Sequence, residues 1–373
     1  MRFLDKIGKE VLFLKSTEEN QRNGEGDFIR LKDGSIMHAY SAFVGSSFLD
    51  FSKSYIRAIY SYDEGETWTE PKDLILLEEG DVNLMCVSFL RMKNDDLGIF
   101  YGRKFKKEGS DLIYTNFLFR RSSDEGKTWS IPVQCHNIDD YVCYENGRVI
   151  RTKTGRIIIP LNLHRHNKNG LEGFDGGQAF FFASDDDGKS FHQIGNFYSL
   201  PFECRWGLQE NGLIELESGR LFSYNRTAYG CQYESFSDDD GETWSQPKPS
   251  ITFYSPLAPM NTKHLGDKYT VAVHCPYGGR LDKLYARSPF ICNIVKGGGE
   301  DFWKQFHCKF YLEDDLDKYY CYPSIFSGDD YFLVAYYIGK IYKDKYIGFG
   351  DMKIVKVKYS EFEETLESFY PIR

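Results

Sequence analysis

The chain has 373 residues, of which 41% are hydrophobic and 17% are aromatic, and its formal net charge is −9. This acidic balance argues against a nucleic-acid partner, because phosphate binding needs a basic surface, but it leaves room for a local basic pocket. No run approaches the roughly 20 apolar residues that a membrane-spanning helix needs, so we expect no membrane partner.

Cysteine usage and the amino-terminal stretch bear on the compartment. The nine cysteines are scattered and odd in number, with no C-x-x-C pair. That usage is typical of a reducing compartment rather than of a disulfide framework. Residues 1–15 carry charges throughout and lack the apolar core of a signal peptide. We therefore expect a cytoplasmic protein.

Short strands recur in groups of three along the chain, and the first strand of each group ends in a tight turn such as Asp-Gly or Asn-Asp. The six first strands are predicted at residues 26–32, 84–92, 143–151, 212–216, 259–264 and 322–326. The second strands follow at residues 35–43, 97–103, 156–164, 220–226, 268–274 and 331–337. The third strands follow at residues 55–60, 115–121, 178–183, 232–236, 290–295 and 347–352.

An octapeptide follows the third strand in the first four groups. Its pattern is S-x-D-x-G-x-[T/S]-[W/F], and its copies cover residues 61–68, 122–129, 184–191 and 237–244. A turn explains the pattern, because Ser and Asp side chains bond nearby backbone N–H groups, Gly tolerates positive φ, and the aromatic residue returns to the core. Four copies at a regular interval indicate an internal repeat. The fifth copy is degenerate, at residues 296–303, and the sixth group lacks it.

Three strands, the octapeptide turn and an outer fourth strand form a four-stranded antiparallel blade. Six blades of about 60 residues fill the chain, within the range of roughly 4–8 blades found in β-propellers. The predicted fold class is therefore all-β, a six-bladed β-propeller that forms a single domain over residues 1–373. Ring closure would pair residues 10–15 with residues 353–359 and leave no open sheet edge. The only helical periodicity lies at residues 361–368.

Strand direction alternates within a blade, so the start of the first strand, the end of the second and the start of the third meet on one face. The octapeptides lie on the opposite face, which favours a structural role for them. The ionisable and polar residues predicted on the first face are Arg22, Asn23, Glu25, Asp27, Asp50, Asn83, Arg103, Tyr144, Glu145, Asn146, His164, His166, Glu210, Arg226, Asn261, Arg280, Arg287, Tyr320 and Tyr322.

Three arginines from different blades, Arg22, Arg226 and Arg287, are expected to converge at the mouth of the central funnel. Guanidinium groups bind carboxylates through paired, charge-assisted hydrogen bonds, so this triad predicts a site for an anionic ligand. A tyrosine beside a glutamate can act as a nucleophile, because the carboxylate takes the phenol proton, and an aspartate across the pocket can be a general acid. His164 and His166 point the same way on a strand, but a metal site needs a third ligand. We expect no metal and no other cofactor.

The fourth blade carries a specific resemblance. Its segments, followed by the octapeptide that ends at Trp244, resemble the central blade of sialidases (neuraminidases); they are Glu210-Asn211-Gly212-Leu213-Ile214-Glu215-Leu216, Gly219-Arg220-Leu221 and Asn225-Arg226-Thr227. In that family this blade holds the glutamate partner of the nucleophile and one arginine of the carboxylate-binding triad. The resemblance assigns these roles to Glu210 and Arg226.

Further positions extend the resemblance. Tyr322-Pro323-Ser324 resembles the segment around the family's nucleophilic tyrosine, and Arg287 opens a third strand where the family has another triad arginine. At the amino end, residues 21–27 replace the family's Arg-Ile-Pro tripeptide, with Arg22 in roughly the same place. Asp50 lies at about the chain distance expected for the acid/base aspartate. The octapeptides resemble the family's Asp-box (BNR) repeats over nearly the whole chain, which looks like a divergent sialidase.

The resemblance implies an exo-α-sialidase-type glycoside hydrolase that removes a terminal sialic acid with retention. Tyr322, assisted by Glu210, would attack the anomeric carbon, Asp50 would act as acid and base, and the arginine triad would hold the substrate carboxylate. The expected partner is an anionic sugar or glycan. Two alternatives stay open, since a fold alone does not determine function. One is a glycosidase or lyase acting on another acidic sugar, and the other is a non-catalytic propeller that binds carbohydrate or protein.

Overall fold

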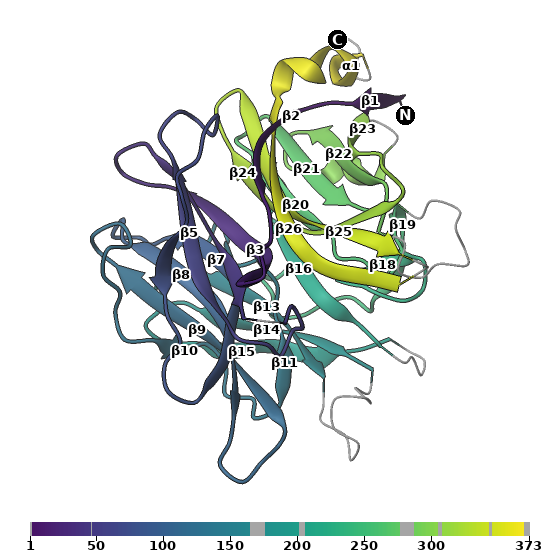
Figure 1. Cartoon of the computed structure of the whole chain (residues 1–373). Coiled ribbons are helices and arrows are strands. Elements are labelled where there is room, and N and C mark those ends of the chain that lie inside the picture. Colours follow the sequence, from purple (N-terminus) through teal and green to yellow (C-terminus); the bar gives the residue numbers. More distant parts are fainter. Residues whose placement is uncertain are drawn as a thin grey trace.

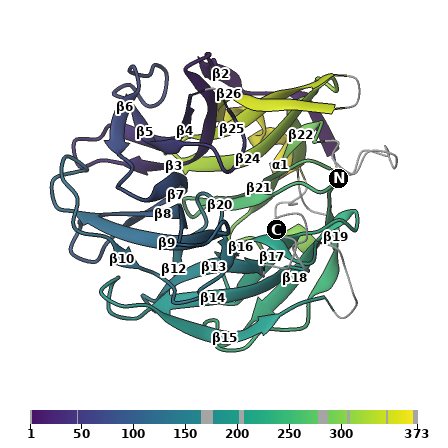
Figure 2. The ribbon, with the colours of Figure 1, turned by 60° about the horizontal axis from the view of Figure 1, so that its bottom comes forward.

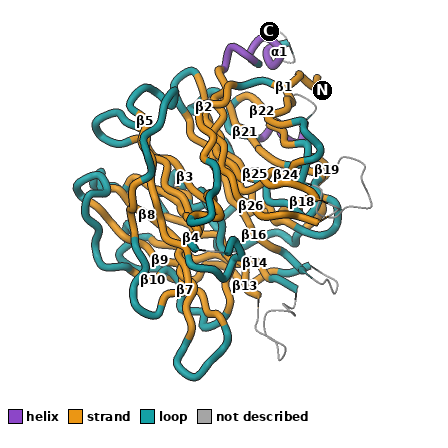
Figure 3. Tube along the Cα trace, in the orientation of Figure 1, coloured by secondary structure: helices purple, strands orange, loops and turns teal. Residues whose placement is uncertain are grey.

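The computed structural model describes residues 2–45, 47–164, 176–200, 206–276, 287–304, 308–342 and 345–368. Six sheets stand around a central axis, as Figure 1 and the turned view in Figure 2 show. Strands make up most of the ring, and the helical segments are short (Figure 3). The predicted all-β, six-bladed β-propeller of four-stranded antiparallel blades is confirmed.

The first three blades follow one another along the chain. Blade one consists of β3 (Asn20–Arg30), β4 (Ile36–Val44), β5 (Ser54–Ser61) and β6 (Lys72–Ile75). Blade two consists of β7 (Asp81–Arg91), β8 (Leu97–Lys106), β9 (Ile113–Ser122) and β10 (Val133–Gln134). Blade three consists of β11 (Tyr141–Cys143), β12 (Ile150–Arg151), β13 (Ile157–His164), β14 (Gln178–Ser184) and β15 (His192–Tyr198).

The last three blades complete the ring. Blade four consists of β16 (Gln209–Glu215), β17 (Leu221–Arg226), β18 (Cys231–Ser237) and β19 (Lys248–Tyr254). Blade five consists of β20 (Asn261–Leu265), β21 (Tyr269–His274), β22 (Phe290–Lys296) and β23 (Cys308–Glu313). Blade six consists of β24 (Lys318–Ser327), β25 (Tyr331–Tyr342), β26 (Lys345–Lys358) and β2 (Lys9–Leu14).

The innermost strand of blade three differs from the prediction. A continuous strand over residues 143–151 is wrong, because the chain leaves the sheet between β11 and β12. The backbone there bonds to the neighbouring blade instead: the Gly147 amide donates to the Val87 carbonyl at 2.9 Å and the Arg148 amide donates to Ser88 Oγ at 3.1 Å. This detour brings the segment that contains Glu145 to the axis.

The ring closes with strands from both ends of the chain. The amino-terminal β2 pairs antiparallel with β26, in register Lys9 with Lys356 and Leu14 with Met352, as the sequence predicted. One strand was not predicted: β1 (Arg2–Lys6) adds to blade five in parallel with β23. The amino-terminal strands therefore join blades five and six.

Helices are short. The expected carboxyl-terminal helix is present as α1 (Glu363–Glu367), after a 3₁₀ turn at Tyr359–Glu361, and a second 3₁₀ turn covers Glu300–Trp303. Across the described ranges, no helix has the length and apolar character needed to cross a membrane.

The hydrophobic core lies between neighbouring blades. One cluster joins Met37 and Ile56 of blade one to Val87 and Phe89 of blade two, and equivalent clusters lie at other blade interfaces. Each sheet therefore buries apolar side chains on both faces, and the residues at the axis are left for polar contacts.

The octapeptides form the expected turns. In the fourth copy, Ser237 Oγ donates to Asp239 Oδ1 at 2.8 Å and accepts from the Gly241 amide at 2.9 Å, while the Thr243 amide donates to Asp239 Oδ1. The other three copies repeat these bonds. Trp244 returns to the core, where its ring stacks on Phe181 of blade three with centroids 4.1 Å apart.

The fourth residue of each octapeptide also clamps the preceding blade. Glu125 accepts the Lys32 amide of blade one at 2.9 Å, Asp187 accepts the Lys93 amide of blade two, and Asp240 accepts Thr154 Oγ1 of blade three. In the first copy, Glu64 accepts from Tyr331 Oη of blade six at 2.6 Å. The four residues share a positive φ, which turns their carboxylates toward the neighbouring turn. We call these contacts the carboxylate clamps.

Side chains at the axis tie blade three to four other blades. Asn146 Nδ2 donates to the Gly26 carbonyl of blade one at 2.9 Å and to the Pro323 carbonyl of blade six at 3.4 Å. Arg148 donates to the Met260 carbonyl at 2.6 Å and to the Glu210 carbonyl. Because these backbone groups are buried, the side chains supply the hydrogen bonds that water cannot.

Replacing Glu125 by Ala is expected to lower the free energy of unfolding by about 2 kcal/mol, because a charge-assisted clamp between two blades is lost. Burial raises the pKa of Glu125, but the bonds from Arg91 and the Lys32 amide outweigh it and lower that pKa. The contribution is thus complete above the unfolded-state pKa of about 4.3 and declines as the pH falls through the lower folded-state value. Urea denaturation at pH 7 and pH 3 tests this, with Lys127→Ala in the same turn as the control. Equal losses in both variants would contradict the clamp.

Replacing Arg148 by Met is expected to lower the free energy of unfolding by about 2–4 kcal/mol, because two buried carbonyl groups lose their donor. Arg148→Lys, which keeps the charge but reaches fewer acceptors, should lie between Met and the wild type. Urea denaturation monitored by tryptophan fluorescence measures both. If Arg148→Met were as stable as the wild type, the axis contacts would not hold the blades together.

Candidate active site

Irregularities in four innermost strands point side chains into the funnel. The register shifts between Gly24 and Asp27 in β3, between Met85 and Ser88 in β7, between Gln209 and Gly212 in β16, and between Cys321 and Ser324 in β24. Each shift contains a non-glycine residue with positive φ; these are Glu25 (50°), Cys86 (61°), Glu210 (45°) and Tyr322 (55°). Such strained residues cluster at functional sites.

All four strained residues line one pocket. Blade three contributes Glu145, and Asp50 and Lys104 come from blades one and two. The remaining lining residues are Met85, Tyr141, Val142, Cys143 and Tyr144. The pocket is small, with a cavity volume of about 90 Å³. Four carboxyl groups, three phenols and an ammonium group thus line one small space.

Glu210 connects a tyrosine and an arginine. Its Oε1 accepts from the Tyr322 hydroxyl at 3.1 Å and from Arg226 Nη1 at 2.5 Å. Burial raises the pKa of Glu210, but Arg226 outweighs that effect and lowers it, so the glutamate is a carboxylate. Burial and the Glu210 charge hold the pKa of Tyr322 well above its usual range. The phenol therefore keeps its proton and donates a hydrogen bond to the Glu210 carboxylate.

Arg287 lies on the other side of Tyr322. Its guanidinium carbon is 5.7 Å from the centre of the Tyr322 ring, and its Nε donates to the Leu257 carbonyl at 3.3 Å. The charge of Arg287 acts on both Arg226 and Tyr322. Two of the three predicted arginines therefore flank the tyrosine.

Arg22 approaches from blade one and is 2% exposed. Its Nη2 donates to Glu25 Oε1 at 2.5 Å, its Nη1 donates to Asp50 Oδ1 at 2.5 Å, and its Nε donates to the Tyr337 hydroxyl at 3.0 Å. The Tyr337 ring packs edge-on against Tyr322 with centroids 5.8 Å apart. Of the six site residues predicted from the sequence, Tyr322, Glu210 and Asp50 line the pocket. The three arginines, Arg22, Arg226 and Arg287, each contact one of these three residues.

Asp50 sits on the loop after β4 with 59% of its side chain exposed. Its carbonyl accepts from Lys104 Nζ at 2.8 Å and from Asn83 Nδ2 at 2.6 Å, so the loop is anchored to blade two. Loss of hydration within the surrounding protein raises the pKa of Asp50, but the charges of Arg22 and Lys104 outweigh this effect and lower the pKa to about 2. In this state Asp50 is an ion-paired carboxylate.

Several pocket residues had no role in the sequence-based hypothesis. Glu25 and Glu145 were placed on the correct face but given no function, and Lys104 was passed over in favour of its neighbour Arg103. The structure turns Lys104 into the pocket and Arg103 away from it. The signal for Glu25 was available in the sequence, because the glycines on either side of it permit a bulge: a Cβ at position 26 would lie 2.3 Å from the Ala39 carbonyl oxygen.

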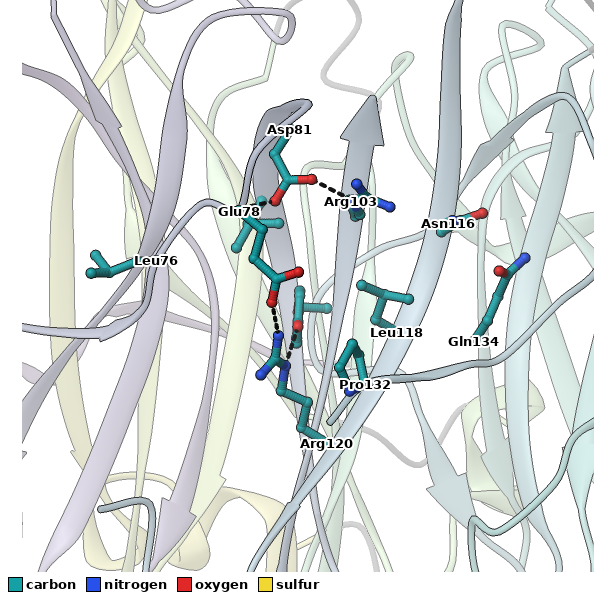
Figure 4. A pocket seen from close by; sticks show the side chains of 11 residues that line it. Leu76, Glu78, Asp81, Arg103, Asn116, Leu118, Arg120, Pro132 and Gln134 are labelled. Carbon is teal, nitrogen blue, oxygen red and sulfur yellow. Dashed lines mark hydrogen bonds and ion pairs between the residues drawn. The ribbon is translucent and has the colours of Figure 1, made fainter. Parts of the chain in front are cut away.

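Arg103 belongs to a second pocket between blades one and two. Figure 4 shows that its charged residues face one another: Arg103 pairs with Asp81, and Arg120 pairs with Glu78 at 2.5 Å. Both arginines of this pocket are thus paired with carboxylates, and none of the strained residues of the funnel lines it.

Of the two histidines predicted on the first face, His164 and His166, the structure describes His164. His164 ends β13 and is buried, which lowers its pKa to about 4, so it is neutral. His166 and Arg280 lie outside the described residues. Among the residues that the structure describes, no group of three or more His, Cys, Asp or Glu side chains could hold a metal ion.

Comparison with known proteins agrees with this architecture. The profile of the BNR repeat-like domain matches residues 83–334. The anhydrosialidase of Macrobdella decora is 26% identical over 244 residues, which are 60% of this chain and 29% of that protein. The chain thus spans less than a third of the length of this relative.

Solved structures share the fold at low identity. A protein of unknown function from Dyadobacter fermentans matches with a TM-score of 0.71 and 18% identity, over 94% of this chain and 99% of that one. A leech intramolecular trans-sialidase matches with a TM-score of 0.71 and 14% identity, over 96% and 71%. The NanB sialidase of Streptococcus pneumoniae matches with a TM-score of 0.71 and 13% identity, over 95% and 71%. Since the family profile covers more than half of its residues, the chain belongs to the family of BNR repeat-like domains, and it shares its six-bladed fold with these sialidase structures.

Proposed function

We propose that the protein is an exo-α-sialidase-type glycoside hydrolase that releases a terminal sialic acid with retention of configuration. The observation that carries this proposal is the Glu210 carboxylate, which accepts from both the Tyr322 hydroxyl and Arg226. A tyrosine with a carboxylate base and adjacent arginines is the arrangement that an anionic sugar requires, and tyrosine-nucleophile sialidases depart from the usual two-carboxylate scheme.

The charges suit a sugar acid. Arg226 and Arg287 flank Tyr322, and Arg22 is held nearby through Tyr337. A phenol is uncharged until it reacts, so it does not repel the substrate carboxylate as an aspartate or glutamate nucleophile would. The guanidinium groups bind the carboxylate and orient the anomeric carbon over the Tyr322 hydroxyl.

The reaction proceeds in two displacements. Tyr322 Oη bonds to the anomeric carbon while its proton passes to Glu210 Oε1, and the bond to the leaving oxygen breaks as Asp50 donates a proton to that oxygen. Water then attacks the anomeric carbon and gives a proton to Asp50. The tyrosyl bond breaks, and the phenolate recovers its proton from Glu210. Two inversions at one carbon give net retention.

Asp50 must change partner before it can act. In the free site its carboxylate is paired with Arg22 Nη1 and stays ionised, so it has no proton to donate. A substrate carboxylate that binds Arg22 displaces Asp50, which then loses its nearest cation and faces a new anion. Both changes raise the pKa of Asp50 toward the range of a general acid. Substrate binding therefore prepares Asp50 to act as the general acid.

Replacing Tyr322 by Phe is expected to lower kcat/KM for a fluorogenic sialoside by about 10³-fold or more, because the nucleophile is lost. Binding of the 2,3-dehydro glycal of sialic acid should change less than about 3-fold, since the ring and the arginines remain. Tyr320→Phe, on the same strand, is the control and should keep wild-type activity. Product analysis should score both free and anhydro sugar, because the relatives include an anhydrosialidase.

The wild-type protein offers the decisive comparison. The absence of both turnover and glycal binding would contradict the sialic-acid proposal. Binding without turnover would favour a carbohydrate-binding propeller. Turnover of other acidic glycosides but not of the sialoside would favour a glycosidase or lyase that acts on another acidic sugar.

The exchange at Arg22 predicts proton uptake on binding. At pH 5, titration calorimetry of the wild type with the glycal in buffers of different ionisation enthalpy should show uptake of up to about one proton. Asp50→Asn should show almost none and should bind the glycal more tightly at pH 7, since no carboxylate competes for Arg22. Equal uptake in both proteins would contradict the exchange.

A further inference from the structure

Three glutamates line the pocket together with Asp50, and the partners of the three glutamates differ. Glu25 from blade one is paired with Arg22, and Glu210 from blade four is paired with Arg226. Glu145, from the segment between β11 and β12, is 8% exposed and lines the same pocket. Within the described part of the chain, no arginine or lysine forms an ion pair with Glu145. Its carboxyl accepts one hydrogen bond among these residues, from the backbone N–H of Asn146 at 3.4 Å.

The nearby arginines are committed to other groups. Arg148 donates to two backbone carbonyls, and Arg226 donates to Glu210. The other charged and titratable groups that face Glu145 come from every element around it and are Glu25, Asp50, Cys86, Lys104, Tyr141, Cys143, Tyr144 and Tyr322. Burial, followed by the charges of Glu210 and Glu25, holds the pKa of Glu145 well above its usual range.

An ionised Glu145 carboxylate would also repel the proposed anionic ligand. It would stand next to the position where an anionic sugar binds, and a like charge in a desolvated site costs several kcal/mol. A neutral carboxylic acid carries no such penalty and adds an O–H donor. The other carboxylates that line the pocket, Glu25, Asp50 and Glu210, already face arginines.

We propose that Glu145 is a specificity-determining residue that stays a neutral carboxylic acid in the pocket and donates a hydrogen bond to an uncharged oxygen of the bound sugar. This inference rests on the proposed function. The arginines select the carboxylate of the ligand, and Glu145 selects a hydroxyl or carbonyl oxygen on the blade-three side. Loss of the Glu145 proton at alkaline pH turns the donor into a repelling charge, so affinity falls while the chemistry at Tyr322 is unchanged.

The test measures affinity for the 2,3-dehydro glycal between pH 5 and pH 9. The wild type should bind more weakly as the pH rises. Glu145→Gln keeps a donor and cannot ionise, so it should bind within about 3-fold of the wild type at pH 6 and should lose the alkaline decline. Glu145→Ala should bind about 10–100-fold more weakly at pH 6, because a buried hydrogen bond is lost. Glu18→Gln, on the exposed surface, is the control and should match the wild type.

Deoxy analogues of the glycal separate binding from folding. The analogue that lacks the contacted oxygen should lose affinity for the wild type and should bind Glu145→Ala as well as the parent glycal does. A Glu145→Gln variant as weak as Glu145→Ala, or one that keeps the alkaline decline, would overturn this inference. Absence of glycal binding by the wild type at every pH would overturn the proposed function and this inference with it.

Discussion

Ring closure is the constraint on which the site depends. The six innermost strands converge only if the last blade meets the first, and the pairing of β2 with β26 makes blade six from both ends of the chain. The carboxylate clamps then fix blades one to four, each against the blade before it. Because Glu25, Glu210 and Tyr322 come from three blades, the distances between their functional groups are set by blade angle rather than by local sequence.

The positive φ values at the funnel are held by this global structure. A non-glycine residue in the left-handed region costs about 1–3 kcal/mol, and it persists only where its surroundings determine it. Arg148 bonds the Glu210 carbonyl and Asn146 bonds the Pro323 carbonyl, so the backbone on or beside two strained residues is held by blade three. The axis hydrogen bonds thus hold the backbone in the conformation that orients Glu210 and Tyr322.

The limits of sequence-based prediction follow from the same distinction. The octapeptide turns were predictable because Ser237, Asp239 and Gly241 bond within eight residues. The grouping of Arg22, Arg226, Arg287 and Tyr322 followed from blade phase and family resemblance. The role of Lys104 was not predictable, because β8 continues to Lys106 and so the strand end was set three residues early. Glu145 was placed on the correct face, but its role was not predictable, because its strand breaks to bond the backbone of blade two and no local sequence pattern indicates that contact.

The pocket carboxyl groups differ in charge state because their partners differ. Glu210 is ionised by Arg226, and in the proposed mechanism it serves as the base; Asp50 is ionised by Arg22, which the proposal hands to the ligand on binding. Among the described residues, Glu145 has two carboxylates and no ion-paired cation beside it, which favours its neutral form. In the proposed mechanism an acidic protein accepts an anionic sugar without a net basic surface, because Arg226 is held by a carboxylate that stays fixed and Arg22 by one that yields to the ligand. Binding in this proposal exchanges the Asp50 carboxylate for the carboxylate of the ligand at Arg22.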